Sequence, residues 1–314
     1  MIRLTLHQLN ILQAVARGGS FSHASRELHL SQPAVSMQIK QLEDSLGLPL
    51  FEQIGKRIHL TEAGKEVLTY ARAITQQLDE LEGVLNGLKG LSGGRLRISV
   101  ATTANYFIPT LLGNFSRRYP DVTVTLDVTN RETLLRQLSE NTVDLVIMGQ
   151  PPVEADVEAE AFMDNPLVVV APPDHPLAGK KKIPLARLQE ETFLVRESGS
   201  GTRIAMERFF NERGMKLRTG MEVGSNEAIK QSVQAGLGLG LLSQATIEQE
   251  LALKRLVVLD IAEFPIMRQW FVVHRKGKRL SAAAEAFRNF LLAQPGNRRR
   301  PGKAESLHRR KRKR

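Results

Sequence analysis

Apolar residues recur at helical spacing in three short stretches at the start of the chain. Apolar positions three and four residues apart lie on one face of a helix, so each stretch predicts a short amphipathic helix. Ser20 and Ser31 stand where N-caps belong, and Pro33 falls in a first turn, where its missing N–H costs nothing. The second and third helices are therefore joined tightly. The apolar stripes consist of Leu9, Leu12, Val15 and Ala16; Phe21, Ala24 and Leu28; and Val35, Ile39, Leu42 and Leu46.

After Gly47 the helical spacing gives way to a loose alternation over residues 50–60. This segment is centred on Gly55, Lys56 and Arg57, which predicts a two-stranded wing with a basic tip. Three short helices followed by such a wing predict a small, mainly helical domain over residues 1–61.

A longer apolar pattern begins after Thr61 and Gly64. Its members are spaced alternately four and three residues apart, which is the a/d seam of a coiled coil. We predict a helix over residues 62–91 that pairs two chains; packing of this helix on a globular core is the alternative. The seam consists of Val67, Ala71, Ile74, Leu78, Leu81, Leu85 and Leu88, and the dimer contacts are assigned to the last five.

Strand and helix patterns alternate from Arg95 to residue 294. Alternating βα units predict parallel sheets covered by helices on both faces. About 200 residues of this pattern fit two lobes: lobe I over about 95–165 and 268–294, and lobe II over about 166–267. Ligands of such folds bind at the carboxyl ends of strands. The expected strands are 96–100, 122–128, 144–148, 167–171, 193–195, 221–223 and 269–274.

The face of the third helix opposite its apolar stripe presents polar and small residues. A helix with such a face can enter the major groove of DNA, where Gln32 can pair with adenine and Lys40 with guanine or a phosphate. Lys56 and Arg57 of the wing can hold the DNA backbone. The alternative is the solvated surface of an ordinary helical bundle. The candidate DNA-contacting residues are Gln32, Pro33, Ser36, Met37, Lys40, Lys56 and Arg57.

The net charge of +11 is concentrated at the end of the chain. Residues 295–314 hold ten basic residues and one acidic residue, Glu305, and account for nine of those charges. Because this segment has almost nothing apolar to bury, we expect it to be disordered. It either adds sequence-independent attraction to phosphates or is only a solvated extension.

Several classes of protein do not fit this sequence. The chain contains no cysteine, which excludes disulfides, thiolate metal sites and cysteine nucleophiles. The first residues lack the features of a signal peptide, and no apolar run is long enough to span a bilayer. The histidines are scattered, and no paired-carboxylate motif is present. We therefore expect a cytoplasmic protein with no catalytic residues, no metal, no cofactor and no membrane contact.

Residues 14–64 resemble the DNA-binding domain of LysR-type transcriptional regulators almost throughout. The resemblance is carried by the run Ser31–Ser36, by Leu50 with Phe51, and by residues 60–64, in that order and spacing. It implies a winged helix-turn-helix, a coiled-coil linker helix and a two-lobed effector domain like that of periplasmic binding proteins. It also implies a homodimer that forms a homotetramer, with promoter DNA and RNA polymerase as partners.

A narrower resemblance is carried by residues 101–135 and 144–152. These segments are similar to those of LysR-type regulators of Calvin-cycle operons in carbon-fixing bacteria. That resemblance implies an activator of RuBisCO genes whose effector is a phosphorylated metabolite or NADPH. A LysR-type regulator of another metabolic operon is the alternative.

Polar and glycine residues follow the strands of the predicted effector domain. By resemblance they line the cleft between the lobes, and the Ser198–Arg203 turn offers free N–H groups and a guanidinium to an anion. For each of them taken alone, simple helix capping is the better explanation, but their convergence on one cleft favours ligand binding. The candidate effector residues are Thr102, Thr103, Asn130, Arg131, Gly149, Gln150, Ser198, Gly199, Gly201, Thr202 and Arg203.

Three other functions compete with a regulator. A solute-binding protein would share the two-lobed half, but the lack of a signal peptide argues against it. An enzyme could share the fold, which alone is never evidence of catalysis. A non-specific nucleic-acid binder would depend on residues 295–314.

Overall fold

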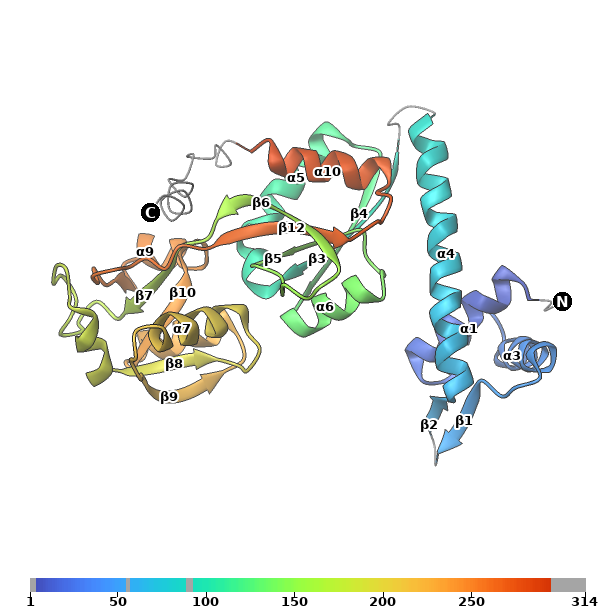
Figure 1. Ribbon diagram of the computed structural model, residues 1–314, viewed down its shortest axis with the longest axis horizontal. Helices are drawn as coiled ribbons and strands as arrows, with labels where there is room; N and C mark the ends of the chain where they lie inside the picture. Colours follow the sequence, from blue (N-terminus) through green and yellow to red (C-terminus); the bar gives the residue numbers. More distant parts are fainter. Residues whose placement is uncertain (1–3, 55–56, 89–92, 295–314) are drawn as a thin grey trace, which may run out of the picture.

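The computed structural model describes residues 4–54, 57–88 and 93–294 of the 314. The chain forms a small helical domain, one long helix and a two-lobed α/β domain (Figure 1). The first unit contains α1 (Leu6–Gly18), α2 (Phe21–Glu27), α3 (Gln32–Leu46), β1 (Phe51–Ile54) and β2 (Arg57–Leu60). This arrangement confirms the predicted winged helical domain followed by an α/β region.

The helices of the first domain begin and end where side chains can satisfy the backbone. Thr5 forms a capping box with Gln8, while Ser20 and Ser31 accept hydrogen bonds from the third residue of α2 and α3. Gly47 ends α3 with a φ of 72°, a left-handed conformation that glycine adopts without strain. The predicted N-caps and the position of Pro33 are confirmed.

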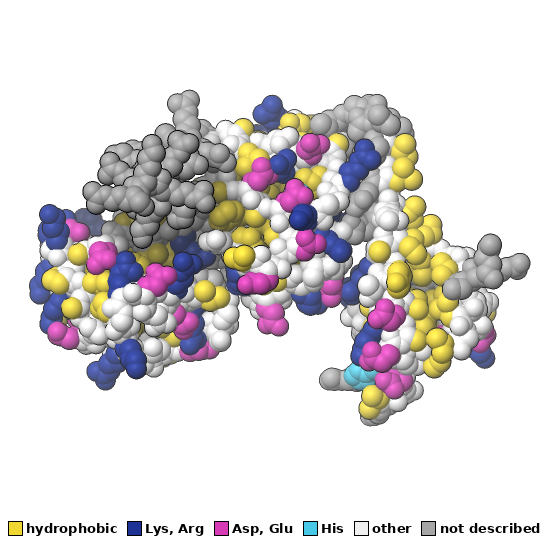
Figure 2. Space-filling model, in the orientation of Figure 1, with side chains coloured by type: hydrophobic (Ala, Val, Ile, Leu, Met, Phe, Trp, Pro, Cys, Tyr) yellow, Lys and Arg dark blue, Asp and Glu magenta, His cyan; other side chains and the backbone are white. Residues whose placement is uncertain are grey.

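The long helix α4 (Glu62–Leu88) divides the predicted seam into two parts. Near its start, Ala71 is buried in the core of the first domain and Val67 packs against that core. The later apolar residues are 36–53% exposed, and hydrophobic side chains follow the helix in Figure 2. Packing of this helix on a globular core, the alternative to pairing of two chains, is therefore seen only in its first turns. The exposed seam residues are Ile74, Leu78, Leu81 and Leu85; the Leu88 side chain and residues 89–91 lie outside the described part.

Lobe I is built on a five-stranded sheet in the order β4-β3-β5-β12-β6. Its core lies between this sheet and the helices and includes Phe115, Phe162 and Phe287, all almost fully buried. The strands are β3 (Gly94–Ala101), β4 (Val122–Thr129), β5 (Leu145–Met148), β6 (Val157–Asp164) and β12 (Gln269–Arg275). The helical elements are η1 (Thr102–Tyr106), α5 (Ile108–Arg118), α6 (Arg131–Ser139) and α10 (Ala282–Leu292).

Lobe II has a second sheet in the order β11-β7-β10-β8-β9. Apolar side chains on both of its faces are buried, including Val169, Val170 and Phe193. The strands are β7 (Leu167–Ala171), β8 (Thr192–Arg196), β9 (Arg218–Val223), β10 (Leu239–Ser243) and β11 (Val257–Val258). The helical elements are η2 (Leu185–Glu190), α7 (Gly201–Asn211), α8 (Asn226–Gln234), η3 (Gln244–Thr246) and α9 (Glu248–Ala252).

The expectation of wholly parallel sheets is wrong. In lobe I, β12 runs antiparallel to both β5 and β6, and in lobe II β7 runs antiparallel to β10 and β11. Strand β7 enters its sheet from β6 of lobe I through residues 165–166, and β12 enters its sheet from lobe II, so neither strand follows a crossover helix within its own sheet and the βα argument does not apply to them. Strand β6 was not predicted, because its acidic residues obscure the apolar pattern. After β3 the chain forms the turn η1, and the helix α5 begins at Ile108.

Two segments connect the lobes and lie side by side. The Asn165 N–H donates to the Arg268 carbonyl at 2.7 Å, and the Leu167 N–H donates to the Ile266 carbonyl at 2.9 Å. Residues 267–268 thus lead directly from lobe II into β12 of lobe I. The second connection places residues from the end of the chain at the junction between the lobes.

Two further observations concern the described residues as a whole. No helix among them is long and apolar enough to cross a membrane. No group of three or more His, Asp or Glu side chains among them is arranged to hold a metal ion. The predicted disordered tail, residues 295–314, lies outside this part of the chain.

Candidate functional site

The outward face of α3 carries the residues expected to contact DNA. Val35, Ile39 and Leu42 are buried against the rest of the domain. The opposite side of the helix is open to solvent, and Met37 there is 53% exposed. A protruding α-helix fits the width of the major groove. The exposed residues of this face are Gln32, Pro33, Ser36, Met37 and Lys40.

Side-chain hydrogen bonds hold the wing at a fixed position beside α3. Glu43 on α3 accepts hydrogen bonds from the backbone N–H groups of Leu50 (2.7 Å) and Phe51 (3.2 Å). Gly64 allows α4 to approach the wing, because a Cβ there would lie 2.0 Å from the Leu50 carbonyl oxygen. The antiparallel register of β1 and β2 pairs Ile54 with Arg57. Lys56 and the Arg57 side chain lie outside the described residues.

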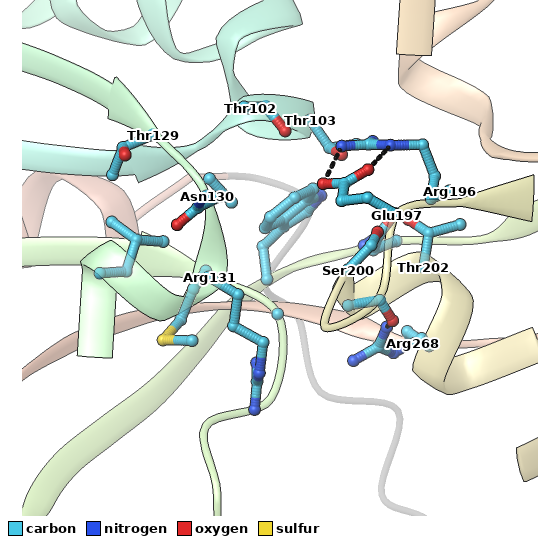
Figure 3. Close-up of a pocket in the computed structure, with 17 residues that line it drawn as sticks. Thr102, Thr103, Thr129, Asn130, Arg131, Arg196, Glu197, Ser200, Thr202 and Arg268 are labelled. Atoms are coloured by element: carbon cyan, nitrogen blue, oxygen red, sulfur yellow. Dashed lines mark hydrogen bonds and ion pairs between the residues drawn. The ribbon is translucent and has the colours of Figure 1, made fainter. Parts of the chain in front are cut away.

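A cavity lies between the two lobes (Figure 3). It forms where β3, β4 and β5 of lobe I end, opposite the end of β8 in lobe II. This is the edge at which open α/β sheets bind ligands. We call residues 267–275, which lead from lobe II into and along β12, the connecting strand. The main lining residues are Thr102, Thr103, Thr129, Asn130, Arg131 and Gly149 from lobe I, Arg196, Glu197, Ser200, Gly201 and Thr202 from lobe II, and Arg268 and Trp270 from the connecting strand.

The N-termini of α6 and α7 meet at this cavity from opposite lobes. Asn130 caps α6 by accepting a hydrogen bond from the Thr133 N–H at 2.9 Å. Ser200, at the start of α7, makes no side-chain capping bond. The first N–H groups of a helix have no acceptor within it, and the helix dipole adds partial positive charge there. The cavity therefore attracts negative charge from both lobes.

Two arginines add positive charge without a carboxylate partner among the described residues. Arg131 donates to the Gln150 carbonyl at 3.0 Å, and Arg268 donates to the Gly201 carbonyl at 2.6 Å. Burial lowers the pKa of both guanidinium groups, and the charge of Arg131 further lowers the pKa of Arg268. Both remain protonated near neutral pH. A Cβ at Gly149 would come within 3.1 Å of the Arg268 guanidinium, so glycine makes room for it.

The charge of Arg196 is compensated by Glu197, and the side chain is linked to lobe I through Asn226. It is 3% exposed and donates to both carboxylate oxygens of Glu197, at 2.7 and 2.8 Å. Its third contact is the side-chain oxygen of Asn226 at 2.5 Å, and Asn226 in turn donates to the Thr103 hydroxyl at 3.1 Å. The Thr103 hydroxyl thus already accepts a hydrogen bond from lobe II. Figure 3 shows Thr103, Arg196 and Glu197 on the side of the cavity away from Arg131.

A charged cluster beside α8 makes a second contact between the lobes. Lys230 is almost fully buried and lies 2.8 Å from carboxylate oxygens of both Glu227 and Glu250. Its ammonium group is 4.9 Å from the ring centre of Tyr106 in lobe I. Burial lowers the pKa of Lys230, but hydrogen bonds to Glu227 and Glu250 outweigh it and the net shift is upward. Together with the Asn226–Thr103 bond, this cluster holds the lobes together.

The structure brings most, but not all, of the predicted effector residues to the cavity. Gln150 lines a neighbouring groove instead, while Ser198 and Gly199 lie on an exposed turn. The role expected for Arg203 is not supported, because its guanidinium is paired with Glu207 and Glu222 and does not line the cavity. The predicted residues that do line it are Thr102, Thr103, Asn130, Arg131, Gly149, Gly201 and Thr202.

The contribution of the connecting strand to the cavity was not predicted from the sequence. Arg268 and Trp270 are two residues apart, and side chains at that spacing project from the same side of a strand. The spacing of Arg268 and Trp270 indicates that both side chains share one side of a strand. The hydrophobic pattern of the sequence could not show that this strand runs from one lobe into the other. Arg196 and Glu197 were missed because the strand ending at residue 196 was predicted one residue too short.

Comparisons with known proteins agree with this description. Residues 6–65 match the family model described as "Bacterial regulatory helix-turn-helix protein, lysR family". Residues 89–296 match the "LysR substrate binding domain". The chain is 60% identical over 293 residues to a RuBisCO operon transcriptional regulator of Allochromatium vinosum, across 93% of this chain and 97% of that protein.

Two solved structures are similar in fold. The CcmR regulatory domain of Synechocystis PCC6803, in complex with 2-PG, is 48% identical with a TM-score of 0.61, covering 63% of this chain and 96% of that one. A full-length OxyR variant of Pseudomonas aeruginosa has a TM-score of 0.75 over 94% of this chain and 96% of its own. Since that second identity is 24%, it bears on the fold alone.

Proposed function

The chain belongs to the LysR family of bacterial transcriptional regulators, and from that premise we propose that it activates carbon-fixation genes in response to a small anionic metabolite. The operon is inferred from the RuBisCO operon regulator that is 60% identical to it. The anion is inferred from Arg131 and Arg268, whose side chains donate only to backbone carbonyls among the described residues, beside two helix N-termini. The related CcmR domain, with its bound 2-PG, supports the same ligand class.

DNA recognition is assigned to α3 and the wing. In this proposal Gln32, Pro33, Ser36, Met37 and Lys40 face the base edges, while Lys56 and Arg57 hold phosphates. The support is the exposure of the α3 face and the rigid attachment of the wing through Glu43. Contacts to base edges give specificity, whereas contacts to phosphates give affinity for any sequence.

Replacing Gln32 by Ala should weaken binding to the operator by about 1–3 kcal/mol and leave binding to random DNA nearly unchanged. The matched control is Arg57→Ala, which should weaken binding to all sequences and reduce the salt slope by about one unit. Fluorescence anisotropy with operator and scrambled duplexes at several salt concentrations measures both effects. Equal losses on the two duplexes for Gln32→Ala would show that this residue does not read bases.

The proposed organisation follows the predicted segments. Residues 1–61 bind DNA, residues 62–91 pair two chains, residues 95–294 bind the effector, and residues 295–314 form a basic tail. Pairs of dimers form a tetramer that contacts RNA polymerase in the cytoplasm. Effector binding changes the relation between the lobes and, through the tetramer, the geometry of the bound promoter, by an amount set by its differential affinity for the two arrangements.

We expect the effector to be bound rather than chemically converted. No pair of a nucleophile and an adjacent base lines the described part of the cavity. Its charged residues are arginines and one glutamate, Glu197, which is already paired with Arg196. These groups suit recognition of an anion through hydrogen bonds and charge.

Anion binding should depend on Arg131 and not on Arg203. Arg131→Gln removes a positive charge from the cavity and should weaken 2-phosphoglycolate binding about ten- to hundredfold, as expected for a charge-assisted hydrogen bond. Arg203→Gln is the control, because its partners Glu207 and Glu222 lie outside the cavity, and it should change affinity less than about threefold. Isothermal titration calorimetry tests both variants. The reverse ranking would place the anion at the Ser198–Arg203 turn instead.

A further inference from the structure

Trp270 lines the effector cavity with a buried donor that has no acceptor among the described residues. The residue is 2% exposed, and its indole Nε1 makes no hydrogen bond within the described part of the chain. Buried indole N–H groups in folded proteins almost always find an acceptor, because an unmade hydrogen bond is costly. A donor of this kind at the wall of a ligand cavity indicates a partner that the ligand itself supplies.

The connecting strand places Trp270 beside Arg268. Residues two apart on a strand share a face, and both Arg268 and Trp270 line the cavity. Their neighbours Met267, Gln269 and Phe271 line a separate groove, which Arg268 also borders, whereas Trp270 lines the cavity and not that groove. Arg268 and Trp270 thus present one side of this strand to the cavity. On that side it offers a guanidinium and an indole N–H, both of which can only donate.

The Trp270 ring is held in a fixed position. It packs against Phe107 with ring centres 5.2 Å apart and is part of the lobe I core. The pairing of β12 with β6 shifts register between Trp270 and Phe271, and such bulges re-aim side chains. A rigid ring loses little entropy when it binds a ligand. The indole N–H is thus a preorganised donor.

We propose that Trp270 Nε1 and the Arg268 guanidinium jointly bind the anionic oxygens of the effector, and that Trp270 determines specificity for an oxyanion. This inference rests on the proposed function and identifies where in that site the anionic group of the effector binds. Two donor-only groups donate hydrogen bonds to a carboxylate, phosphate or sulfate oxygen and disfavour a cation or an N–H donor. The anionic end of the effector therefore points to the connecting strand, and its remaining polar groups face Thr102, Asn130 and Thr202.

Trp270 is the only tryptophan in the chain, so its fluorescence reports on this position alone. The full-length protein is titrated with 2-phosphoglycolate and with inorganic phosphate while the emission is recorded, and the same titrations are followed by calorimetry. We expect the emission to change and then saturate as ligand is added, with the same midpoint concentration as the calorimetric titration. This arm uses the unmodified chain, so it gives a result even if a variant fails to fold.

The second arm removes the N–H while keeping an aromatic ring. Trp270→Phe should weaken 2-phosphoglycolate binding at least about tenfold in calorimetry, the loss expected for a hydrogen bond to a charged group. Phe107→Leu is the matched control: it disturbs the packing of the same ring, removes no donor and does not line the cavity, so its effect should stay below about threefold. Thermal unfolding checks that both variants are folded.

The outcomes separate the two proposals. Wild-type affinity in folded Trp270→Phe, an equal loss in Phe107→Leu, or unchanged emission at calorimetric saturation each overturns the role of Trp270 while leaving an anion effector in place. A wild-type protein that binds neither anion overturns the anion proposal and the Trp270 proposal together.

Discussion

Leu78→Asp should convert the protein from paired chains to single chains. Leu78 is 41% exposed in one chain and lies in the middle of the apolar seam of α4. A dimer buries this side chain, so the variant loses apolar burial in both chains and places two unpaired carboxylates in the interface. The cost is about 4 kcal/mol per dimer, and dissociation should become roughly a thousandfold easier. Sedimentation velocity across a range of concentrations measures the change.

The neighbouring Gln77 provides the matched control for that experiment. Gln77 is exposed and lies one residue away, on a different side of the helix from the seam. Gln77→Asp introduces the same charge at nearly the same position along the helix axis and should leave the oligomer intact. If Leu78→Asp sedimented like the wild type, or if Gln77→Asp dissociated equally, α4 would not pair chains through this seam. A monomeric variant should also lose affinity for an operator with two half-sites, because each domain would then bind alone.

Lys230→Ala should destabilise lobe II by about 3 kcal/mol, the cost of breaking a buried ion pair from one side. Glu250 would be left with an uncompensated carboxylate that is 12% exposed, and one of its oxygens already lacks a hydrogen-bond donor among the described residues. The cation-π contact to Tyr106 would also be lost, which weakens the link to lobe I. Urea unfolding at pH 7 measures the difference from wild type.

The effect of Lys230→Ala should depend on pH in a defined direction. The hydrogen bond from Lys230 lowers the pKa of Glu227 from its usual 4.5, so this stabilisation is present above pH 4.5 and is lost as pH falls through the depressed folded value. The pKa of Lys230 is raised from 10.5, so its contribution is present below that pH and lost as pH rises further. The difference from wild type should therefore be constant between about pH 5 and 10 and shrink outside that window.

Two further variants test the ion-pair explanation. Lys216 is exposed, and Lys216→Ala should change stability by less than about 0.5 kcal/mol. Combining Lys230→Met with Glu250→Gln removes both buried charges and should recover much of the loss. If the double variant were no more stable than Lys230→Ala alone, the cost would come from packing and not from an unpaired carboxylate.

The N-terminal domain was the part most accessible to sequence reasoning. Its helices are short-range structures, and Ser20, Ser31 and Pro33 mark their starts by local chemistry. The exposed face of α3 followed from the same periodicity that identified its buried stripe. The dividing point along α4 could not be predicted, because a 3.5-residue repeat does not distinguish a partner chain from the domain's own core.

The cavity was harder to predict because it is assembled from distant segments. Thr102, Asn130 and Gly149 follow strands that local patterns identify, and they were found in this way. Arg268 and Trp270 belong to a strand whose neighbours are set by the crossing between lobes, which no local pattern records. The position of Arg203 outside the cavity could not be predicted, because a cation beside a helix start suits an anion in sequence, while its pairing with Glu222 depends on tertiary contact.

The position of β12 has a consequence for how the chain is synthesised. This strand lies between β5 and β6 in the lobe I sheet, yet it is made only after all of lobe II. Because chains emerge from the ribosome N-terminus first, the lobe I sheet lacks β12 between β5 and β6 until lobe II has been synthesised. The DNA-binding domain is finished much earlier. A chain truncated before residue 269 would retain that domain and lack an internal strand of the lobe I sheet, so DNA binding without effector control is the expected behaviour of incomplete chains.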